Sequence, residues 1–350
     1  MSELVKFPNL RGKLCIKNLY NFVDVDEACD ANLKTKEHLE ELELYWDKQF
    51  KDSLADKAVL DVLQPSMNLK KLSIEFYGGT SFPHWLGDCS FSNIVYLCLS
   101  SCEYCVTLPP LGPLTSLKGL QIKDMTRVET IGVEFYGMTS GGTNFPFQPF
   151  PALEKLEFER MPNWKQWLSF RGNAFPFPRL KTLCLIHCTK LKGHLPSHLP
   201  SIEEIAIIMC DYLLDTPSIQ HWLSSVKSLD FHSAGSVELS LLGSDSPCLM
   251  QDAKFYSFKT LLSLPKMLLS STCLQNLDLT YIDSLAAFPA DCLPTSLQSL
   301  FIHGCGDLAF LPLEMWSKYT SLVTLELGDC CDALTTFPLN GFPALRSLTI

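Results

Sequence analysis

The amino-acid sequence predicts an α/β solenoid, in which short parallel strands stack side by side and irregular or briefly helical segments join them. Three observations predict it. A motif with apolar residues at steps of three and two, followed by a cysteine, runs from Leu180 as "LKTLCLIHC" and recurs along the chain. Most copies lie 22 to 30 residues apart. Apolar residues make up 47% of the chain, which is enough for one continuous core.

Thirteen copies of the motif follow one another. They are "LRGKLCI" from Leu10, "LEELEL" from Leu39, "LKKLSI" from Leu69, "IVYLCL" from Ile94, "LKGLQI" from Leu117, "LEKLEF" from Leu153, "LKTLCL" from Leu180, "IEEIAI" from Ile202, "VKSLDF" from Val226, "LQNLDL" from Leu274, "LQSLFI" from Leu297, "LVTLEL" from Leu322 and "LRSLTI" from Leu345. Each supplies one strand whose leucines alternate inward, and only stacked coils bury those leucines. This is the leucine-rich repeat, so we expect a horseshoe with a concave parallel sheet and an irregular, short-helical convex side.

Cysteines follow several of the strands at a fixed distance. They stand three residues after the last apolar position of the motif, where the repeat consensus has Asn or Cys. We therefore interpret them as buried thiols at the turn that leaves each strand: Cys102, Cys188, Cys210, Cys305 and Cys330.

The segments between the strands differ along the chain. Residues 24–39 and 53–64 look helical, the second with Ser53 as N-cap and Pro65 after its end. Later connections contain prolines and should be extended. Residues 128–152 and 232–273 break the period as irregular insertions or degenerate coils, and the second hides a coil that could begin near Val237 or Phe258. We expect residues 1–350 to be a single domain of about 13–14 coils that is truncated at both ends.

Composition narrows the class of partner and the compartment. The net charge of −10 weighs against nucleic acid or an anionic membrane surface as the main partner. No apolar run reaches the roughly 18 residues of a membrane span, and the N-terminus lacks a signal-peptide pattern. Fifteen scattered cysteines and the absence of an Asn-x-Ser/Thr acceptor indicate reduced thiols in the cytosol, with the nucleus left open.

Chemical motifs are missing. There is no phosphate-binding loop, no H-E-x-x-H and no G-x-S-x-G. Cys98, Cys102 and Cys105 have a zinc-like spacing, but Cys98 should face outward and Cys102 inward. His194 and His198 flank Pro196 and read as loop residues, and the pairs Glu41/Glu43 and Glu157/Glu159 read as solvated acidic stripes. We expect no catalytic, cofactor-binding or metal-binding residue in this chain, and no enzyme.

The outward positions of the strands are the candidate partner-binding surface, because they offer aromatic side chains among charges. The candidates are Glu41, Glu43, Tyr45, Trp46, Lys71, Glu75, Phe76, Tyr96, Lys123, Lys155, Glu157, Glu159, Arg160, Ile186, His187, Asp230, His232, Asn276, Asp278, Tyr281, Phe301, His303, Glu326 and Asp329. Trp164 and Trp167 lie beyond a strand, so we expect them to pack on the convex side.

Five stretches resemble one family. They are "GKLCIKNLYNFVDVDEACDANLKTKEHLEELELYW" from Gly12, "SFPHWLGDCSFSNIVYLCLSSCEYCVTLPPLGPLTSLKGLQI" from Ser81, "GVEFYG" from Gly132, "FPALEKLEFERMPNWKQW" from Phe150 and "FPFPRLKTLCLIHCTKLKGHLPSHLP" from Phe175. The sequence resembles the leucine-rich-repeat domain of plant coiled-coil-type NBS-LRR (NLR) disease-resistance proteins, and looks like the legume members. The match covers nearly the whole chain.

The resemblance implies a domain of an intracellular immune receptor. It would sense a pathogen effector directly or through a guarded host protein, and would restrain the receptor's own nucleotide-binding domain. ADP or ATP is expected only in that domain, which is absent here. Early coils would face it, and later coils would meet the effector. The alternative is a substrate-recruiting adaptor of a ubiquitin ligase. A secreted receptor ectodomain is disfavoured, because its glycosylation acceptors and x-G-x-I-P segments are missing.

Overall fold

The structure is a computed structural model. It describes residues 2–22, 25–47, 53–137, 148–170, 175–193, 195–196, 198–214, 225–233, 249–259, 261, 264–287, 293–306, 308–309, 316–330 and 341–350. The chain divides into two compact units, residues 1–201 and 202–350. Each unit is a stack of parallel strands, which confirms the predicted solenoid.

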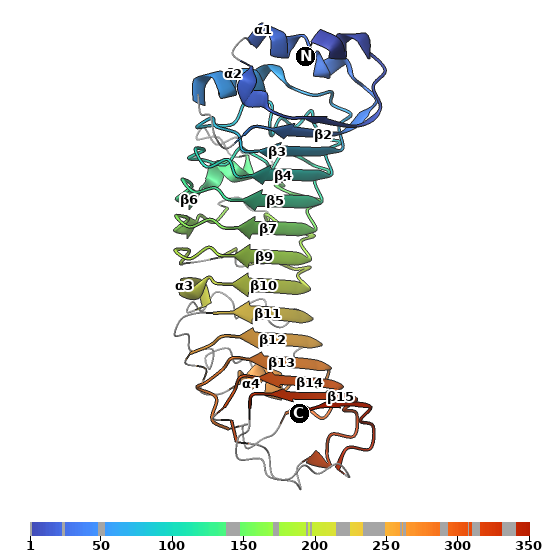
Figure 1. Ribbon diagram of the computed structural model, residues 1–350, viewed down its shortest axis with the longest axis vertical. Helices are drawn as coiled ribbons and strands as arrows, with labels where there is room; N and C mark the ends of the chain where they lie inside the picture. The colour runs from blue at the N-terminus through green and yellow to red at the C-terminus, as the bar shows by residue number, and fades with distance from the viewer. Residues whose placement is uncertain are drawn as a thin grey trace. The chain divides into compact units, whose positions relative to one another are not determined.

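The first unit holds the longer connections. Its main sheet runs in chain order, and Figure 1 shows the strands stacked one after another: β1 Gly12–Ile16, β2 Leu39–Tyr45, β3 Lys71–Glu75, β4 Tyr96–Ser100, β5 Gly119–Lys123, β7 Lys155–Glu159 and β9 Thr182–Ile186. Every strand begins within the predicted motif. Alternate side chains such as Leu72 and Ile74 are buried, whereas Lys71, Ser73 and Glu75 face out, as the twofold period of a strand requires.

Helices occur mainly before β3. Helix α2 spans Ser53–Val62, close to the predicted range, and contacts α1. The predicted helix over 24–39 is mostly wrong: α1 covers only Val25–Cys29, and Asn32 lies in the left-handed region with φ 43°. A left-handed residue interrupts helical hydrogen bonding. Short 3-10 turns make up the rest: η1 Ser2–Lys6, η2 Leu19–Asn21, η3 Leu33–Thr35 and η4 Val133–Tyr136.

An aromatic cluster fills the side of the first unit opposite the outward face. Two short strands, β6 Thr130–Ile131 and β8 Gln166–Trp167, pair in parallel outside the main sheet. Trp164 and Trp167, the second of which belongs to β8, are buried with ring centroids 5.5 Å apart, and both pack on Phe158. The predicted packing of the two tryptophans is confirmed.

The second unit contains a coil that the motif search could not place. Its strands are β10 Glu204–Ile208, β11 Ser228–His232, β12 Asp252–Tyr256, β13 Asn276–Thr280, β14 Ser299–His303, β15 Thr324–Gly328 and β16 Ser347–Thr349 (Figure 1). Strand β12 belongs to the degenerate coil, which was not located in the sequence. Its inward residues are Met250, Ala253 and Phe255, and Phe258 stands at the cysteine position. Two short helices, α3 Asp211–Leu214 and α4 Lys266–Leu269, lie in the connections. The predicted start near Phe258 is therefore wrong, because the motif of this coil begins at Met250. The alternative start near Val237 falls within residues 234–248, which lie outside the described residues.

Four of the five cysteines after the strands are core residues, as predicted, whereas Cys330 is not fully buried. Cys102, Cys188, Cys210 and Cys305 are fully buried, and Cys330 is half-buried. Their thiols approach backbone carbonyl groups: the Sγ of Cys188 lies 3.6 Å from the oxygen of Ile186 and 3.9 Å from that of Phe158. The thiol thus partners a buried carbonyl where the chain turns inward.

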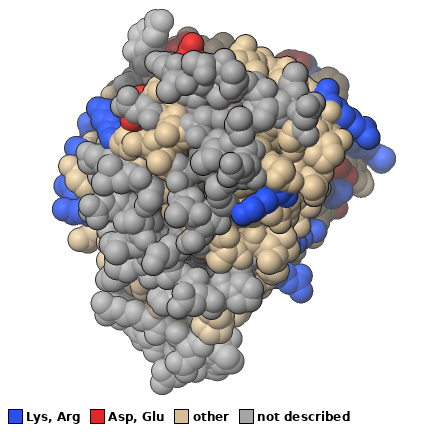
Figure 2. All heavy atoms as spheres, turned by 90° about the horizontal axis from the view of Figure 1, so that it is seen from below, with Lys and Arg blue, Asp and Glu red and all other residues tan. Residues whose placement is uncertain are grey.

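Charged side chains are sparse in the view from below (Figure 2). Among the atoms described there, uncharged residues predominate, and blue Lys and Arg side chains stand mostly toward the margin. The chain's excess of acidic residues is therefore not gathered on the described part of that face.

The prediction of a single domain of 13–14 coils stays a prediction.

Candidate functional site: the outward face of the parallel sheet

The parallel register arranges the outward side chains in rows. In the first unit one row contains Lys13, Glu41, Lys71, Tyr96, Gly119, Lys155 and Thr182, and the next contains Cys15, Glu43, Ser73, Cys98, Gln121, Glu157 and Cys184. A third row contains Tyr45, Glu75, Ser100, Lys123, Glu159 and Ile186. Neighbours in a row are about 4.8 Å apart in the backbone, so their side chains interact directly.

A fourth row stands where the strands end. Phe76, Ser101, Asp124, Arg160 and His187 each follow a strand and have φ between 52° and 58°. Their amide groups still bond to the next strand: the N–H of Asp124 donates to the carbonyl of Glu159 at 2.9 Å. The left-handed conformation breaks the strand's alternation, so residues next to an outward position are also outward.

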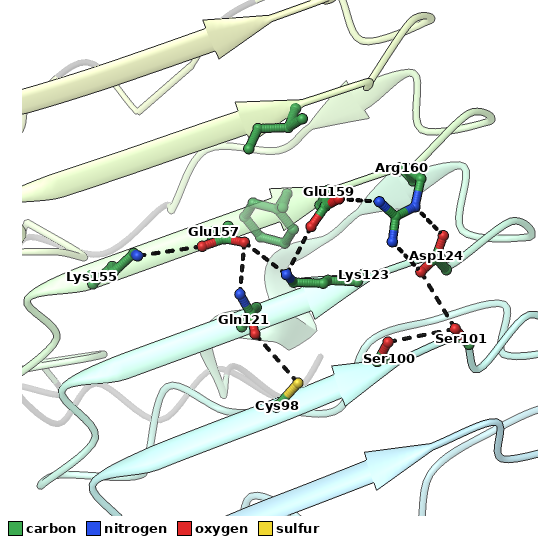
Figure 3. Close-up of polar contacts among 12 residues, drawn as sticks. Cys98, Ser100, Ser101, Gln121, Lys123, Asp124, Lys155, Glu157, Glu159 and Arg160 are labelled. Atoms are coloured by element: carbon green, nitrogen blue, oxygen red, sulfur yellow. Dashed lines mark hydrogen bonds and ion pairs between the residues drawn. The ribbon is translucent and has the colours of Figure 1, made fainter. Parts of the chain in front are cut away.

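Lys123 is the centre of a charge network on this face (Figure 3). Its Nζ lies 2.8 Å from Oε2 of Glu159 and 3.1 Å from Oε1 of Glu157. Glu157 also accepts a hydrogen bond of 2.7 Å from the amide of Gln121 and lies 3.5 Å from the Nζ of Lys155. Glu157 is only 8% exposed. The stripe predicted to be solvated is therefore wrong at Glu157, because neighbouring side chains of the sheet cover its carboxylate.

Arg160 extends the network at the strand ends. Its guanidinium donates to both carboxylate oxygens of Asp124, at 2.6 and 2.9 Å, and also to Glu159 (Figure 3). Asp124 accepts a further bond of 3.4 Å from the hydroxyl of Ser101. This two-point pairing of a guanidinium with a carboxylate is the strongest geometry of its kind.

These contacts keep Glu157 and Lys123 charged. Burial acts to raise the pKa of Glu157, but hydrogen bonds from Gln121 and Lys123 outweigh it and hold that pKa below its usual range. Burial acts to lower the pKa of Lys123, but hydrogen bonds to Glu159 and Glu157 raise it above its usual value. The outward face of the first unit thus neutralises its own charges.

Ion pairs also join the earliest strands. Lys13 lies 2.6 Å from Glu43 and 3.0 Å from Glu41, and Lys71 lies 3.8 Å from Glu41. The hydrogen bond from Lys13 lowers the pKa of Glu43. All these side chains are substantially exposed, so each pair contributes little stability and can exchange for a partner's charge.

Carboxylates on the outward face of the second unit are held differently. The Tyr256 hydroxyl donates to Asp278 at 2.5 Å, the Thr280 hydroxyl donates to Asp278 at 2.7 Å, and Asn276 donates to Asp252. The Nε2 of His232 lies 2.7 Å from Asp230, and the His232 ring packs on Tyr256 at 4.2 Å. Within the described part of this unit, none of Asp230, Asp252, Asp278 and Glu326 has a Lys or Arg ion-pair partner.

Aromatic side chains stand among these carboxylates. Tyr281 follows β13 with φ 55° and is 63% exposed. Phe301 and His303 are half-buried on β14, and the Nε2 of His303 lies 3.5 Å from Glu326. Figure 1 shows the strands β11 to β15 that carry this face.

Most predicted site residues lie on the outward face, but one does not. Trp46 is 1% exposed and packs edge-on against Tyr77. It continues the alternation of Leu42 and Leu44 beyond the end of β2, without the left-handed turn that points Phe76 outward. The prediction that Trp46 faces a partner is therefore wrong.

The other candidates are placed as outward residues. Tyr45 packs on Phe76 with ring centroids 4.9 Å apart, and the Tyr96 hydroxyl donates to Gln121 at 3.0 Å. Arg160, His187, Tyr281 and Asp329 are exposed after their strands, and Ile186 is half-buried. Whether any of them binds a partner stays a prediction.

Sequence reasoning missed several outward residues. Asp252, Lys254 and Tyr256 were overlooked because β12 lacks leucine, although Met250, Ala253, Phe255 and Phe258 keep the repeat's spacing. Gln121 and Asp124 were also missed, and they are the groups that connect Glu157 and Arg160 to the sheet.

Among the described residues, no group of three or more His, Cys, Asp or Glu side chains could hold a metal ion. Cys98 faces out and Cys102 is buried, as predicted. His198 stacks on Phe175, and His194 lies outside the described residues. In the described part of the chain no helix has both the length and the apolar character of a membrane span.

Known proteins with similar sequences are plant disease-resistance proteins. A family model of R13L1/DRL21 leucine-rich repeats matches residues 1–125. The disease resistance RPP13-like protein 1 of Arabidopsis thaliana is 33% identical over 362 residues, which cover 100% of this chain and 30% of that protein. The disease resistance protein RGA1 of Solanum bulbocastanum is 31% identical over 203 residues, or 58% of this chain and 19% of that protein. The chain thus spans less than a third of the length of these relatives.

Solved structures agree on the fold. An internalin from Listeria monocytogenes aligns with a TM-score of 0.51 at 15% identity, covering 92% of this chain and 82% of that one. The TLR13–ssRNA13 complex aligns with a TM-score of 0.62 at 15% identity, covering 99% and 55%. The repeat motif, the parallel solenoid and the similar sequences agree, and the chain belongs to the leucine-rich-repeat domains of plant disease-resistance proteins of the NBS-LRR (NLR) class.

Proposed function

We propose that this chain is the protein-recognition and autoregulatory domain of a plant immune receptor. One observation carries the proposal: parallel strands present rows of outward charged and aromatic side chains on a rigid scaffold. Rigid strands hold such side chains with little loss of conformational entropy on binding, which is what a recognition surface needs.

The two units differ in the charge they offer, which supports two roles. The first unit pairs its own charges in exposed ion pairs such as Lys13 with Glu41 and Glu43. Exposed pairs exchange partners at small cost, so this face suits a reversible contact with the receptor's own nucleotide-binding domain. On the outward face of β11–β15, Asp230, Asp278 and Glu326 have no Lys or Arg ion-pair partner among the described residues, so this face suits a separate partner, a pathogen effector or a guarded host protein.

Neither proposed role needs catalysis or a cofactor from this chain. ADP or ATP would bind in the nucleotide-binding domain of the longer receptor, and no nucleic acid is a proposed partner. We place the receptor in the cytoplasm, with the nucleus left open. The alternative function is that of a substrate-recruiting adaptor of a ubiquitin ligase, since such an adaptor would use the same face to bind a protein.

A capture experiment separates the two functions. The purified chain is immobilised, and the nucleotide-binding domain of the same full-length receptor is supplied as a separate polypeptide, with and without candidate effectors. We expect that domain to be retained and an effector to displace it. Retention of ubiquitin-ligase components, with no retention of the nucleotide-binding domain, would establish the rival.

A further inference from the structure

The side chains on the outward face of β11–β15 in the second unit indicate the kind of partner that would bind there. Three side chains in its central row are carboxylates, Asp230, Asp278 and Glu326, and the aromatic Phe301 stands between the last two. Lys254 lies between Asp230 and Asp278 in register. It is the only Lys or Arg at the described outward positions of β10–β15.

The first unit provides the contrast. Its outward strand positions carry Lys13, Lys71, Lys123 and Lys155 against Glu41, Glu43, Glu75, Glu157 and Glu159, so the two signs nearly balance. There a carboxylate such as Glu157 is held by Lys123 and Lys155, and its charge is cancelled where it stands.

On the second unit, neutral hydrogen-bond donors hold a carboxylate in position, as Lys123 and Lys155 hold Glu157, but they do not cancel its charge. The hydroxyl groups of Tyr256 and Thr280 hold the two oxygens of Asp278, at 2.5 and 2.7 Å. An immobilised carboxylate that keeps its charge loses little entropy when a cation binds it. The exposed ring of Tyr281 and the half-buried ring of Phe301 add aromatic faces, over which a guanidinium packs favourably.

We propose that this sheet face binds a protein segment bearing Arg or Lys side chains, which insert between Asp230, Asp278 and Glu326 and pack on Tyr281. The inference rests on the proposed function, since it names the partner chemistry of a recognition face. Charge complementarity selects this occupant: an acidic or purely apolar segment would leave the carboxylates desolvated without a counter-charge. Lys254 competes with the incoming cations, so its removal strengthens binding.

Fluorescence anisotropy of a labelled peptide of alternating arginine and glycine tests the inference on the full chain. At about 0.1 M salt, where surface charges still act over roughly 10 Å, we expect the peptide to bind and its glutamate counterpart not to bind. Combined Asp230→Asn, Asp278→Asn and Glu326→Gln substitutions should weaken binding at least about tenfold, as loss of charge pairs does at interfaces. Lys254→Ala should tighten it.

Matched variants on the first unit are the controls. Glu41→Gln, Glu43→Gln and Glu75→Gln change the net charge as much as the triple variant, and Lys71→Ala as much as Lys254→Ala. Each should change the affinity less than about twofold, because these substitutions leave Asp230, Asp278, Glu326 and Lys254 unchanged. Equal effects from the two units, or no binding by the unchanged chain, would overturn the inference. If the triple variant fails to fold, Lys254→Ala and Tyr281→Ala still decide, since both side chains are exposed.

The inference and the proposed function can fail separately. If the chain captures the nucleotide-binding domain or an effector and the arginine peptide never binds, the inference falls and the proposed function stands. If the peptide binds this face and neither protein is captured, the inference stands and the proposed function falls.

Discussion

The ring of Tyr96 lies over Gly119, its neighbour in the same outward row. A β-carbon on Gly119 would come within 2.9 Å of the Cδ2 atom of Tyr96. The absence of a side chain at Gly119 lets the ring lie on the sheet, where its hydroxyl reaches Gln121 at 3.0 Å. Gln121 in turn donates to Glu157. A glycine in a strand is therefore used here for close approach of a ring.

Gly119→Ala should displace the Tyr96 ring and weaken its bond to Gln121. Because the ring is 38% exposed and can move, we expect a loss of about 1 kcal/mol in the free energy of unfolding. Chemical denaturation monitored by circular dichroism measures it. Gly306→Ala is the control, since a β-carbon there meets nothing within 4 Å. Equal losses in the two variants would show that Tyr96 plays no part.

Lys123→Met should destabilise the first unit by roughly 2 kcal/mol, because it leaves buried Glu157 without its nearest cation. Lys155 remains 3.5 Å from Glu157 and moderates the loss. The matched control is Lys118→Met, which removes an exposed pair 3.7 Å from Glu154 and should cost less than about 0.5 kcal/mol. Comparable losses from Lys123→Met and Lys118→Met would contradict the network's importance.

The difference in the free energy of unfolding between Lys123→Met and the unchanged chain should narrow as the pH falls. In the unchanged chain the pKa of Glu157 is depressed, so its contribution is present above the unfolded pKa and is lost as pH falls through the folded pKa. In the variant, burial dominates and raises that pKa, so acid relieves a penalty instead. Urea unfolding at neutral pH and at about pH 4, near the reference pKa of Glu, tests this. A constant gap would exclude Glu157 as its source.

The sequence predicted the strands well and the outward residues only in part. Buried leucines repeat with the period of the coils, and this pattern is local, so all thirteen motifs could be located. Strand β12 escaped because Ala253 and Phe255 replace leucine, although the spacing is unchanged. The contacts of Glu157 depend on Gln121 and Lys123 from a strand 36 and 34 residues earlier, and no local pattern reveals them.

Trp46 shows the limit of the alternation rule. After most described strands the backbone turns left-handed, so the residue that follows the strand also faces out, whereas at Trp46 the backbone does not turn in this way. Trp46→Ala should therefore cost about 3 to 4 kcal/mol, the usual effect of emptying a buried tryptophan site. Tyr45→Ala, at the half-buried neighbouring position, should cost clearly less. Thermal melting of both variants decides, and the reverse order would restore Trp46 to the surface.

Lys36 secures the N-terminal segment. Its side chain is 1% exposed, and its Nζ donates to the carbonyl oxygens of Leu4 at 2.8 Å and Phe7 at 3.1 Å. Lys36→Met should leave both carbonyls without this donor, cost about 2 kcal/mol and release residues 2–7. Hydrogen exchange of that segment measures the release, with the exposed Lys34→Met as control. Unchanged protection in Lys36→Met would show that other contacts hold the segment.

Thiol reactivity should divide the cysteines by their place in the repeat. Burial raises the pKa of Cys305 to about 11 and also raises that of Cys102, and both side chains are inaccessible. Because the thiolate is the reacting species, neither should be alkylated by iodoacetamide in the folded chain. Cys29 and Cys89 are exposed and should react first. Mass spectrometry of peptides after brief labelling gives the order, and labelling of Cys305 as fast as Cys89 would contradict its position at the inward turn.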